Sequence, residues 1–177
     1  ARPREVYAAG HLPGSLGVEV QPSFGTWIGW LTEHNSPLVL VLDEIQDSEE
    51  PLRQLARIGY DRVTGILRPD ERFTETYRVV DAGEVAAAAE RGEQILDVRS
   101  PEEWESGTIP GSVLSYVPDL ATETPPVLAT DQPLWLVCET GYRATIAASI
   151  VQARGFVPMV LAEGGATDVL AKTSNRT

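Results

Sequence analysis

A short segment near the start of the chain recurs about 97 residues further on, and this recurrence limits the folds available to the chain. Residues 7–16 (YAAGHLPGSL) and 104–113 (WESGTIPGSV) share Gly, Pro, Gly and Ser in register, each set behind an aromatic residue. Nearly the same offset aligns residues 37–41 with residues 133–137. A two-fold repeat at this spacing predicts two copies of one domain rather than a solenoid.

Apolar runs alternate with helix-like stretches through the second copy. Asp81 and Glu84 form a capping-box pattern at the start of one such helix. Residues 119–132 contain two adjacent prolines and predict a surface excursion with one helical turn. Strands alternating with helices predict an α/β fold in which a parallel sheet is flanked by helices. We expect strands at residues 77–80, 94–98, 112–116, 134–137 and 158–161, and helices at 81–90, 101–106 and 144–153.

The first copy is predicted to be degenerate and truncated. The counterpart of Arg99 is Arg2, so the counterpart of strand 94–98 would lie before residue 1. We predict a degenerate domain at residues 1–68 and a domain with an intact cysteine loop at 77–173. Within the first copy we expect a strand at 38–42, a helix at 49–57, a strand at 62–66 and a linker at 68–76.

The two copies differ at the positions where a chemical site is expected in the second. Leu42 lies opposite Cys138, and Asp47 lies opposite Arg143. The first copy therefore lacks both the cysteine and the arginine that end the loop in the second copy.

Cys138 is the single cysteine of the chain and follows the apolar run 134–137. A five-residue loop separates it from the expected helix, and a strand, a tight loop and a helix N-terminus together present N–H groups to an anion. Helix N-termini and nearby cations favour the nucleophilic thiolate form of cysteine. A lone cysteine is also often a small buried hydrophobic residue. The local sequence leaves both interpretations open.

Composition excludes several classes of partner. The net charge of −12 disfavours nucleic acid and anionic membrane surfaces, and 42% hydrophobic residues are enough for a packed core. One cysteine cannot form an internal disulfide, and no apolar run is long enough to span a bilayer. These features predict a cytoplasmic protein. The two histidines, His11 and His34, form no recognisable metal motif, so no metal site is expected.

Three separated motifs resemble the rhodanese (sulfurtransferase) domain family over about residues 77–171. They are residues 95–99 (ILDVR) with Glu102 and Trp104, residues 107–112 (GTIPGS), and residues 138–143 (CETGYR) before a helix. The resemblance implies a rhodanese-like fold. The first copy, with residues 22–31 (PSFGTWIGWL), is similar to the rhodanese repeats that follow a metallo-β-lactamase-type domain in persulfide-dioxygenase-like fusions. That similarity implies such a domain N-terminal to residue 1.

The family resemblance implies a function and a set of site residues. Cys138 would accept a sulfane sulfur from a small donor as a persulfide and pass it to a thiol or cyanide acceptor, with no cofactor. Arg143 would close the loop, fixing its carbonyls or meeting an incoming anion. Glu139 stands where thiosulfate-using members carry basic residues, which argues against thiosulfate as donor. The remaining implied site residues are the loop positions Glu139, Thr140, Gly141 and Tyr142, and the structural supports Asp97, Arg99 and Glu102.

Asp97 and Arg99 also have a purely structural interpretation. Asp97 would accept backbone hydrogen bonds, and Arg99 would pair with Glu102 or Glu103.

Two other functions stay in competition with sulfur transfer. Cysteine phosphatases place five residues between the cysteine and the arginine, whereas four separate Cys138 from Arg143, a smaller ring that suits sulfur better than phosphate. The chain is also compatible with a non-enzymatic regulatory or docking module of a larger fusion protein. A sulfur adduct on Cys138 would favour transfer over docking.

Overall fold

The computed structural model describes residues 1–174, which form two compact units. The first unit comprises Ala1–Pro13 and Gly17–Thr76, and the second comprises the chain from Tyr77 onward together with Gly14–Leu16. Within the described residues, no helix has both the length and the apolar character that a membrane crossing needs.

The second unit is built on a five-stranded sheet in which every pair of neighbouring strands is parallel. The strand order β3-β7-β6-β4-β5 puts β6 in the centre. This arrangement confirms the predicted α/β class with a parallel sheet flanked by helices. The strands are β3 (Arg78–Asp81), β4 (Ile95–Asp97), β5 (Val113–Leu114), β6 (Pro133–Val137) and β7 (Val157–Glu163).

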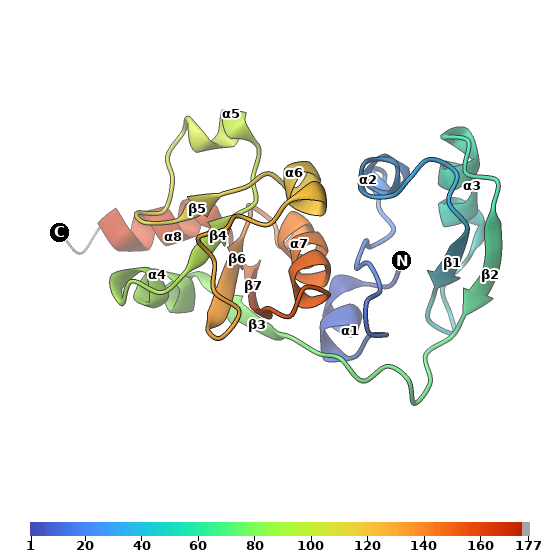
Figure 1. Cartoon of the computed structure of the whole chain (residues 1–177), viewed down its shortest axis with the longest axis horizontal. Helices are drawn as coiled ribbons and strands as arrows, with labels where there is room; N and C mark the ends of the chain where they lie inside the picture. The colour runs from blue at the N-terminus through green and yellow to red at the C-terminus, as the bar shows by residue number, and fades with distance from the viewer. Residues whose placement is uncertain (175–177) are drawn as a thin grey trace. The chain divides into compact units, whose positions relative to one another are not determined.

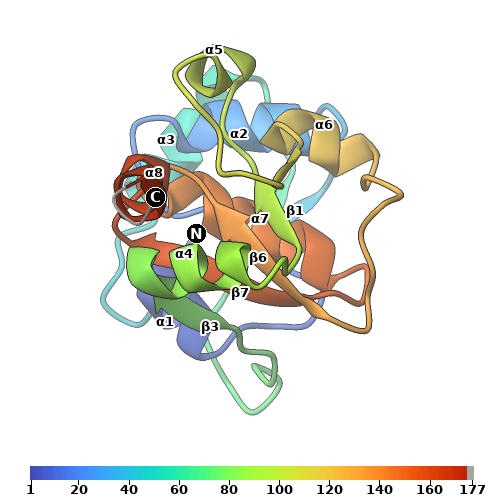
Figure 2. The same ribbon diagram turned by 90° about the vertical axis from the view of Figure 1, so that its left-hand side faces the viewer.

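Helices cover both faces of this sheet (Figures 1 and 2). On one face α4 (Ala82–Glu90) packs beside α8 (Ala166–Ser174), and on the other α6 (Val117–Thr122) packs beside α7 (Tyr142–Gln152). The short α5 (Pro101–Trp104) lies in the connection from β4 to β5. The Asp81 side chain accepts from the amides of Gly83 and Glu84, so the capping box expected at the start of α4 is present.

Alternation along β6 supplies both halves of the core. Trp135 and Val137 belong to the apolar cluster that includes Val85 of α4 and Val169 of α8. Successive side chains of a strand point to opposite faces, so Leu136 is directed to the face covered by α7. Leu136 has no solvent exposure. The strand is thus buried on both sides, which explains its continuous apolar sequence.

The segment after β5 differs from the surface excursion expected at residues 119–132. It opens with α6, whose Val117 and Leu120 side chains are fully buried. Pro118 lies in the first turn, where its fixed φ suits a helix start and its missing N–H costs nothing. The Arg154 guanidinium donates to the carbonyls of Leu120 and Ala121 and so holds the end of the helix. The expected helical turn is therefore present at the start of this segment, but the helix begins earlier, at Val117, and burial and capping stabilise it where an exposed turn was expected.

The first unit contains a two-stranded parallel sheet formed by β1 and β2. The segment 68–76, expected to be a linker, is tied to this unit because His11 and Glu75 exchange both backbone hydrogen bonds. The elements of the unit are α1 (Arg4–Ala9), α2 (Phe24–Leu31), β1 (Leu38–Val41), α3 (Glu49–Arg57) and β2 (Val63–Leu67).

Positions that align in the sequence repeat make the same local contacts inside each unit. The Arg2 guanidinium donates to the Gly10 carbonyl, and the Arg99 guanidinium donates to the Gly107 carbonyl.

The ends of α3 and α7 repeat as well. Gly59 and Gly155 both have positive φ after these helices. The next amides, of Tyr60 and Phe156, return to the carbonyls of Leu55 and Val151.

Candidate active site

Cys138 lies at the carboxyl end of β6, the central strand of the sheet. The helix α7 begins at Tyr142, two residues earlier than expected, so the loop between strand and helix is very short. The Ala144 amide, in the first turn of α7, donates to Cys138 Sγ at 3.4 Å. First-turn amides have no partner within their own helix, and the helix dipole is positive at this end. The sulfur therefore lies where a negative charge is stabilised.

Ala144 is a site residue that the sequence did not identify. The site residues inferred from sequence ended at Arg143, and the amide that donates to Sγ lies one residue further along. The earlier start of α7 explains the shift. A tighter loop brings the third helical residue over the sulfur.

Gly141 holds the tight loop in its conformation for two reasons. Its φ of +78° lies in the left-handed region, which residues with a Cβ rarely adopt. A Cβ at this position would lie 2.9 Å from Ala162 Cα, against strand β7. Both observations require glycine.

The N-terminal end of α8 supports the same loop from the other side. The Ala166 amide donates to the Cys138 carbonyl at 3.0 Å. The Thr167 amide donates to Glu139 Oε2 at 3.4 Å. A Cβ added at Gly165 would overlap the Glu139 carbonyl oxygen, so the two backbones approach closely there. The Glu139 carboxylate is thereby directed to the start of α8, while Thr140 is exposed and Tyr142 is buried.

Arg143 forms a two-point ion pair with Glu103 of α5. Arg143 Nη2 donates to Glu103 Oε1 at 2.7 Å, and Nη1 donates to Glu103 Oε2. Planar guanidinium and carboxylate groups that meet in this way form strong, directional pairs. The sequence had suggested that Arg143 fixes the loop carbonyls or meets an incoming anion, and it did not indicate this pair with a residue 40 positions away.

The pair shifts the titration of both partners. Arg143 holds the pKa of the Glu103 carboxyl at about 2, with help from the Ser100 amide and against the effect of burial. Hydrogen bonding to Glu103 raises the pKa of Arg143, and the charges of Cys138 and Tyr116 raise it further. Arg143 is therefore within electrostatic range of Cys138. Sequence reasoning did not assign Glu103 to the site, although its place as the third residue of α5 in a Ser100 capping box marks it as fixed.

Asp97 and Arg99 form a buried pair at the end of β4. Arg99 Nε donates to Asp97 Oδ1 at 3.0 Å and Nη2 donates to Oδ2 at 2.7 Å, with both side chains almost fully buried. The expected pairing of Arg99 with Glu102 or Glu103 is wrong, because Asp97 is nearer and shares its buried environment. Asp97 also accepts the Arg99 amide, as expected. Glu102 is exposed.

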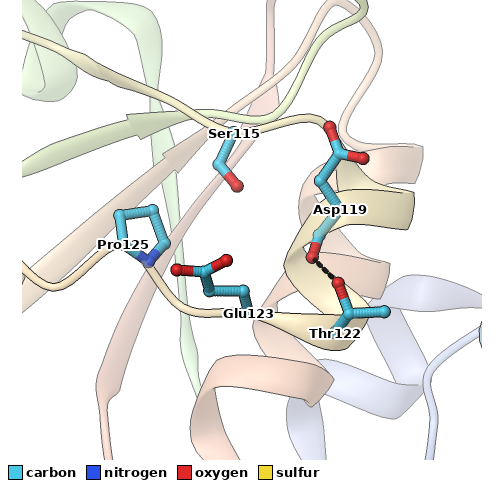
Figure 3. A pocket seen from close by; sticks show the side chains of 5 residues that line it. All are labelled: Ser115, Asp119, Thr122, Glu123 and Pro125. Carbon is cyan, nitrogen blue, oxygen red and sulfur yellow. Dashed lines mark hydrogen bonds between the residues drawn. The ribbon is translucent and has the colours of Figure 1, made fainter.

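A separate cavity of 360 Å³ lies along α6 (Figure 3). Ser115 and the carboxylates of Asp119 and Glu123 line it, with Thr122 and Pro125. Its wall carries two acids and none of the residues of the cysteine loop. Among residues 1–174, no group of three or more His, Cys, Asp or Glu side chains is arranged to hold a metal ion.

A family model described as a rhodanese-like domain matches residues 81–172. No curated protein matches the chain. Among solved structures, a rhodanese-related protein from Thermoplasma volcanium is 25% identical, with 54% of this chain and 93% of that chain covered and a TM-score of 0.47.

Two single-domain sulfurtransferases are also similar in structure. The protein from Saccharomyces cerevisiae is 22% identical, with 58% of this chain and 95% of that chain covered and a TM-score of 0.47. The human protein is 24% identical, with 53% and 96% covered and a TM-score of 0.46.

Proposed function

Because this chain belongs to the rhodanese-like domain family, we propose that it is a sulfurtransferase that carries a sulfane sulfur as a persulfide of Cys138. The observation that supports this most strongly is the hydrogen bond from the Ala144 amide to Sγ at the N-terminal end of α7. A thiolate, and the anionic outer sulfur of a persulfide, both gain from donors and a positive dipole at this position. The family match covers the cysteine, its loop and the helix after it.

The transfer consists of two displacements. The Cys138 thiolate attacks the sulfane sulfur of a small donor, a new S–S bond forms, and the donor's own bond to that sulfur breaks as its remaining part leaves with the electron pair. A thiol or cyanide then attacks the outer sulfur of the persulfide. This second step returns Cys138 as a thiolate. The chain's residues supply the nucleophile and hold the charge, and the chemistry requires no cofactor.

The loop residues divide this work by their positions. Gly141 allows the backbone to turn tightly enough for the Ala144 amide to reach the sulfur. Arg143 places a positive charge within electrostatic range of Cys138. Asp97 and Arg99 fix the ends of β4 and of the segment at Gly107. We assign Cys138 and Arg143 the catalytic roles, and Glu139, Thr140, Gly141 and Tyr142 the substrate-binding backbone.

Thiocyanate formation from cyanide tests the proposal. The wild-type chain is incubated with glutathione persulfide or thiosulfate and cyanide, and thiocyanate is measured. We expect turnover by the wild type and none by Cys138→Ser, whose circular dichroism and unfolding midpoint should match the wild type. Thiocyanate formation by the serine variant at the wild-type rate would refute the assignment of Cys138.

A non-enzymatic regulatory or docking module is the second candidate function, and one observation favours it. Cys138 has no solvent exposure, so a donor has no direct path to Sγ in this conformation. A docking module would give no thiocyanate and no sulfur adduct with any donor. The same experiment therefore separates the two functions.

We also propose that residues 1–68 and 77–173 are two rhodanese-like domains, the first of them degenerate. The matching contacts of Arg2 and Arg99 support this, as do the matching helix ends at Gly59 and Gly155. Residues 22–31 support a further proposal, that a metallo-β-lactamase-type domain precedes this region in a cytoplasmic fusion protein. The partners would be a small sulfur donor and a thiol acceptor, with no nucleic acid and no membrane.

A further inference from the structure

We propose that Glu103 sets the charge preference of the site, turning Cys138 toward sulfur donors of low net charge and away from doubly anionic ones. This inference rests on the sulfurtransferase activity proposed above. Glu103 is a positioning residue here, since it acts through Arg143 rather than by touching the donor.

The geometry shows how completely Glu103 occupies Arg143. Both carboxylate oxygens accept from the guanidinium, in a two-point pair. The carboxylate is itself fixed, because Glu103 Oε2 accepts from the Ser100 amide at 3.0 Å and from the Ser100 hydroxyl at 3.1 Å. The Glu103 side chain is one-third exposed, and that of Arg143 is 18% exposed. The anchored carboxylate takes two of the five N–H donors of the guanidinium and cancels its charge, so an incoming anion meets a neutral pair rather than a free cation.

The other charges around the cysteine loop do not restore a positive field. Arg99 is paired with the buried carboxylate of Asp97. Glu139 is bound to a backbone amide of α8, and Glu102 is exposed on α5. Each of these two arginines is thus paired with a carboxylate, and Glu139 adds a further negative charge that acts on Arg99 at longer range.

The electrostatic range of these groups extends to Tyr116, which follows β5. The charges of Arg143, Glu102, Asp119 and Glu103 all act on the part-buried Tyr116 hydroxyl, whose pKa is raised chiefly by its partial removal from water. Cys138 acts on Arg143 in the same way. A charged donor tail near Cys138 therefore meets a net negative field, which repels a carboxylate tail and attracts an ammonium tail.

Two small persulfides of the same mechanism test this preference. The persulfides of cysteamine and of 3-mercaptopropionate share a sulfane sulfur, a thiolate leaving group and a short chain, and differ in an ammonium or a carboxylate tail at neutral pH. In each case the Cys138 thiolate attacks the outer sulfur of R–S–SH. The products are the Cys138 persulfide and R–S⁻. The ratio of the two rates of Cys138 persulfidation, measured by mass spectrometry, isolates the effect of the tail.

Glu103→Gln is the decisive variant, and Glu102→Gln is its matched control. Both substitutions remove one negative charge from α5, but only Glu103 is bonded to Arg143. We expect wild type to favour the cysteamine persulfide. We expect Glu103→Gln to lower that preference by roughly three- to tenfold, through a lower KM for the anionic donor with little change in kcat. Glu102→Gln should change it less than about twofold.

A double-variant cycle asks whether Glu103 acts through Arg143. In an Arg143→Gln background, Glu103→Gln should shift the ratio of rates by less than it does in wild type, because no guanidinium remains to be released and only the direct charge of Glu103 is lost. An equal shift in both backgrounds would overturn the inference. So would a wild type that reacts faster with the anionic donor, or a Glu103→Gln variant whose ratio of persulfidation rates equals that of wild type. If neither persulfide modifies wild-type Cys138, the proposed sulfurtransferase function fails instead.

Discussion

The two loops at aligned positions in the two units each contain an acidic residue, Asp43 or Glu139, but they differ in the residue before it. In the second unit, the loop after β6 carries Cys138 with a helix amide directed at its sulfur. In the first unit, the loop after β1 begins with Leu42, which is fully buried, and continues with Asp43.

Asp43 fills the first loop with its own polar contacts. Its carboxylate accepts from Arg2 Nε at 2.7 Å, its amide donates to Gln46 Oε1 at 2.8 Å, and its carbonyl accepts from Arg68. Leu42, at the position of Cys138, provides neither a nucleophile nor an acceptor for a helix amide. The comparison teaches that strand, loop and helix can be kept while the site is lost, since function depends on a few side chains placed on the fold.

Moving the cysteine from position 138 to the aligned position 42 is the strongest test of the difference between the two loops. We expect Cys138→Ser to lower sulfur transfer at least about 1000-fold, because the nucleophile is removed. Leu42→Cys in that background should restore nothing, since Asp43 and its partners already occupy the loop. Thiocyanate formation measures both variants, and the wild type serves as control. Recovered turnover in the double variant would show that the two loops are equivalent.

The ion pairs Asp97–Arg99 and Asp43–Arg2 should contribute differently to the free energy of unfolding. Asp97→Asn leaves Arg99 charged and buried without its carboxylate, and breaking such a pair costs about 3–5 kcal/mol. Asp43→Asn should cost about 1 kcal/mol, because the Asp43 side chain is 24% exposed and water can replace it beside Arg2. Urea unfolding of the intact chain measures both. Equal costs would mean that burial does not distinguish the pairs.

Replacing a glycine of left-handed backbone conformation should have a larger effect in the cysteine loop than at the end of α7. Gly141→Ala combines a positive φ with overlap against Ala162, so we expect a loss of about 2–4 kcal/mol and of most activity. Gly155→Ala, with a similar φ but no atom within 4 Å of the new Cβ, should cost about 1 kcal/mol and keep the activity. Unfolding midpoints and thiocyanate rates test the pair, and identical effects would remove the special role of Gly141.

The smallest expected effect is the pH dependence of the Glu103–Arg143 pair, which has no counterpart at Asp47. The pKa of Glu103 is lowered from 4.5 to about 2 in the folded chain by Arg143. The pair therefore stabilises the fold above pH 4.5 and loses its contribution as the pH falls toward 2.

The unfolding free energies of wild type and Glu103→Gln should differ by about 1 kcal/mol at neutral pH, after solvent screening of this part-exposed pair. The difference should vanish near pH 2. A difference that is independent of pH would show that the carboxylate charge contributes nothing to stability.

Much of the second unit followed from local sequence. The run 134–137, the short loop and the helix after it predicted the central strand and the location of Cys138, because a buried strand and a helix start each have a local pattern. The Asp81 capping box was predicted for the same reason. The sequence predicted one helical turn within residues 119–132 but neither the start of α6 at Val117 nor its burial, since its stability comes from burial of Leu120 and from Arg154 far along the chain.

The partners of the site residues could not be derived from sequence. Several acidic residues were possible partners for Arg143 in the sequence, and only the tertiary fold brings Glu103 of α5 next to it. Arg99 was expected to pair with a nearby glutamate, but Asp97 shares its buried environment and a favourable two-residue spacing. The amide of Ala144 reached Sγ because α7 begins early, a boundary that local propensity defines poorly.

Mass mapping of the persulfidated chain tests the central claim most directly. The intact folded protein is incubated with glutathione persulfide. One portion is then treated with cyanide, and both portions are digested and analysed. We predict one added sulfur on Cys138 that cyanide removes, with none on the Cys138→Ser variant. A wild-type Cys138 that remains an unmodified thiol with every donor tried, in a chain whose fold is intact, would contradict the account.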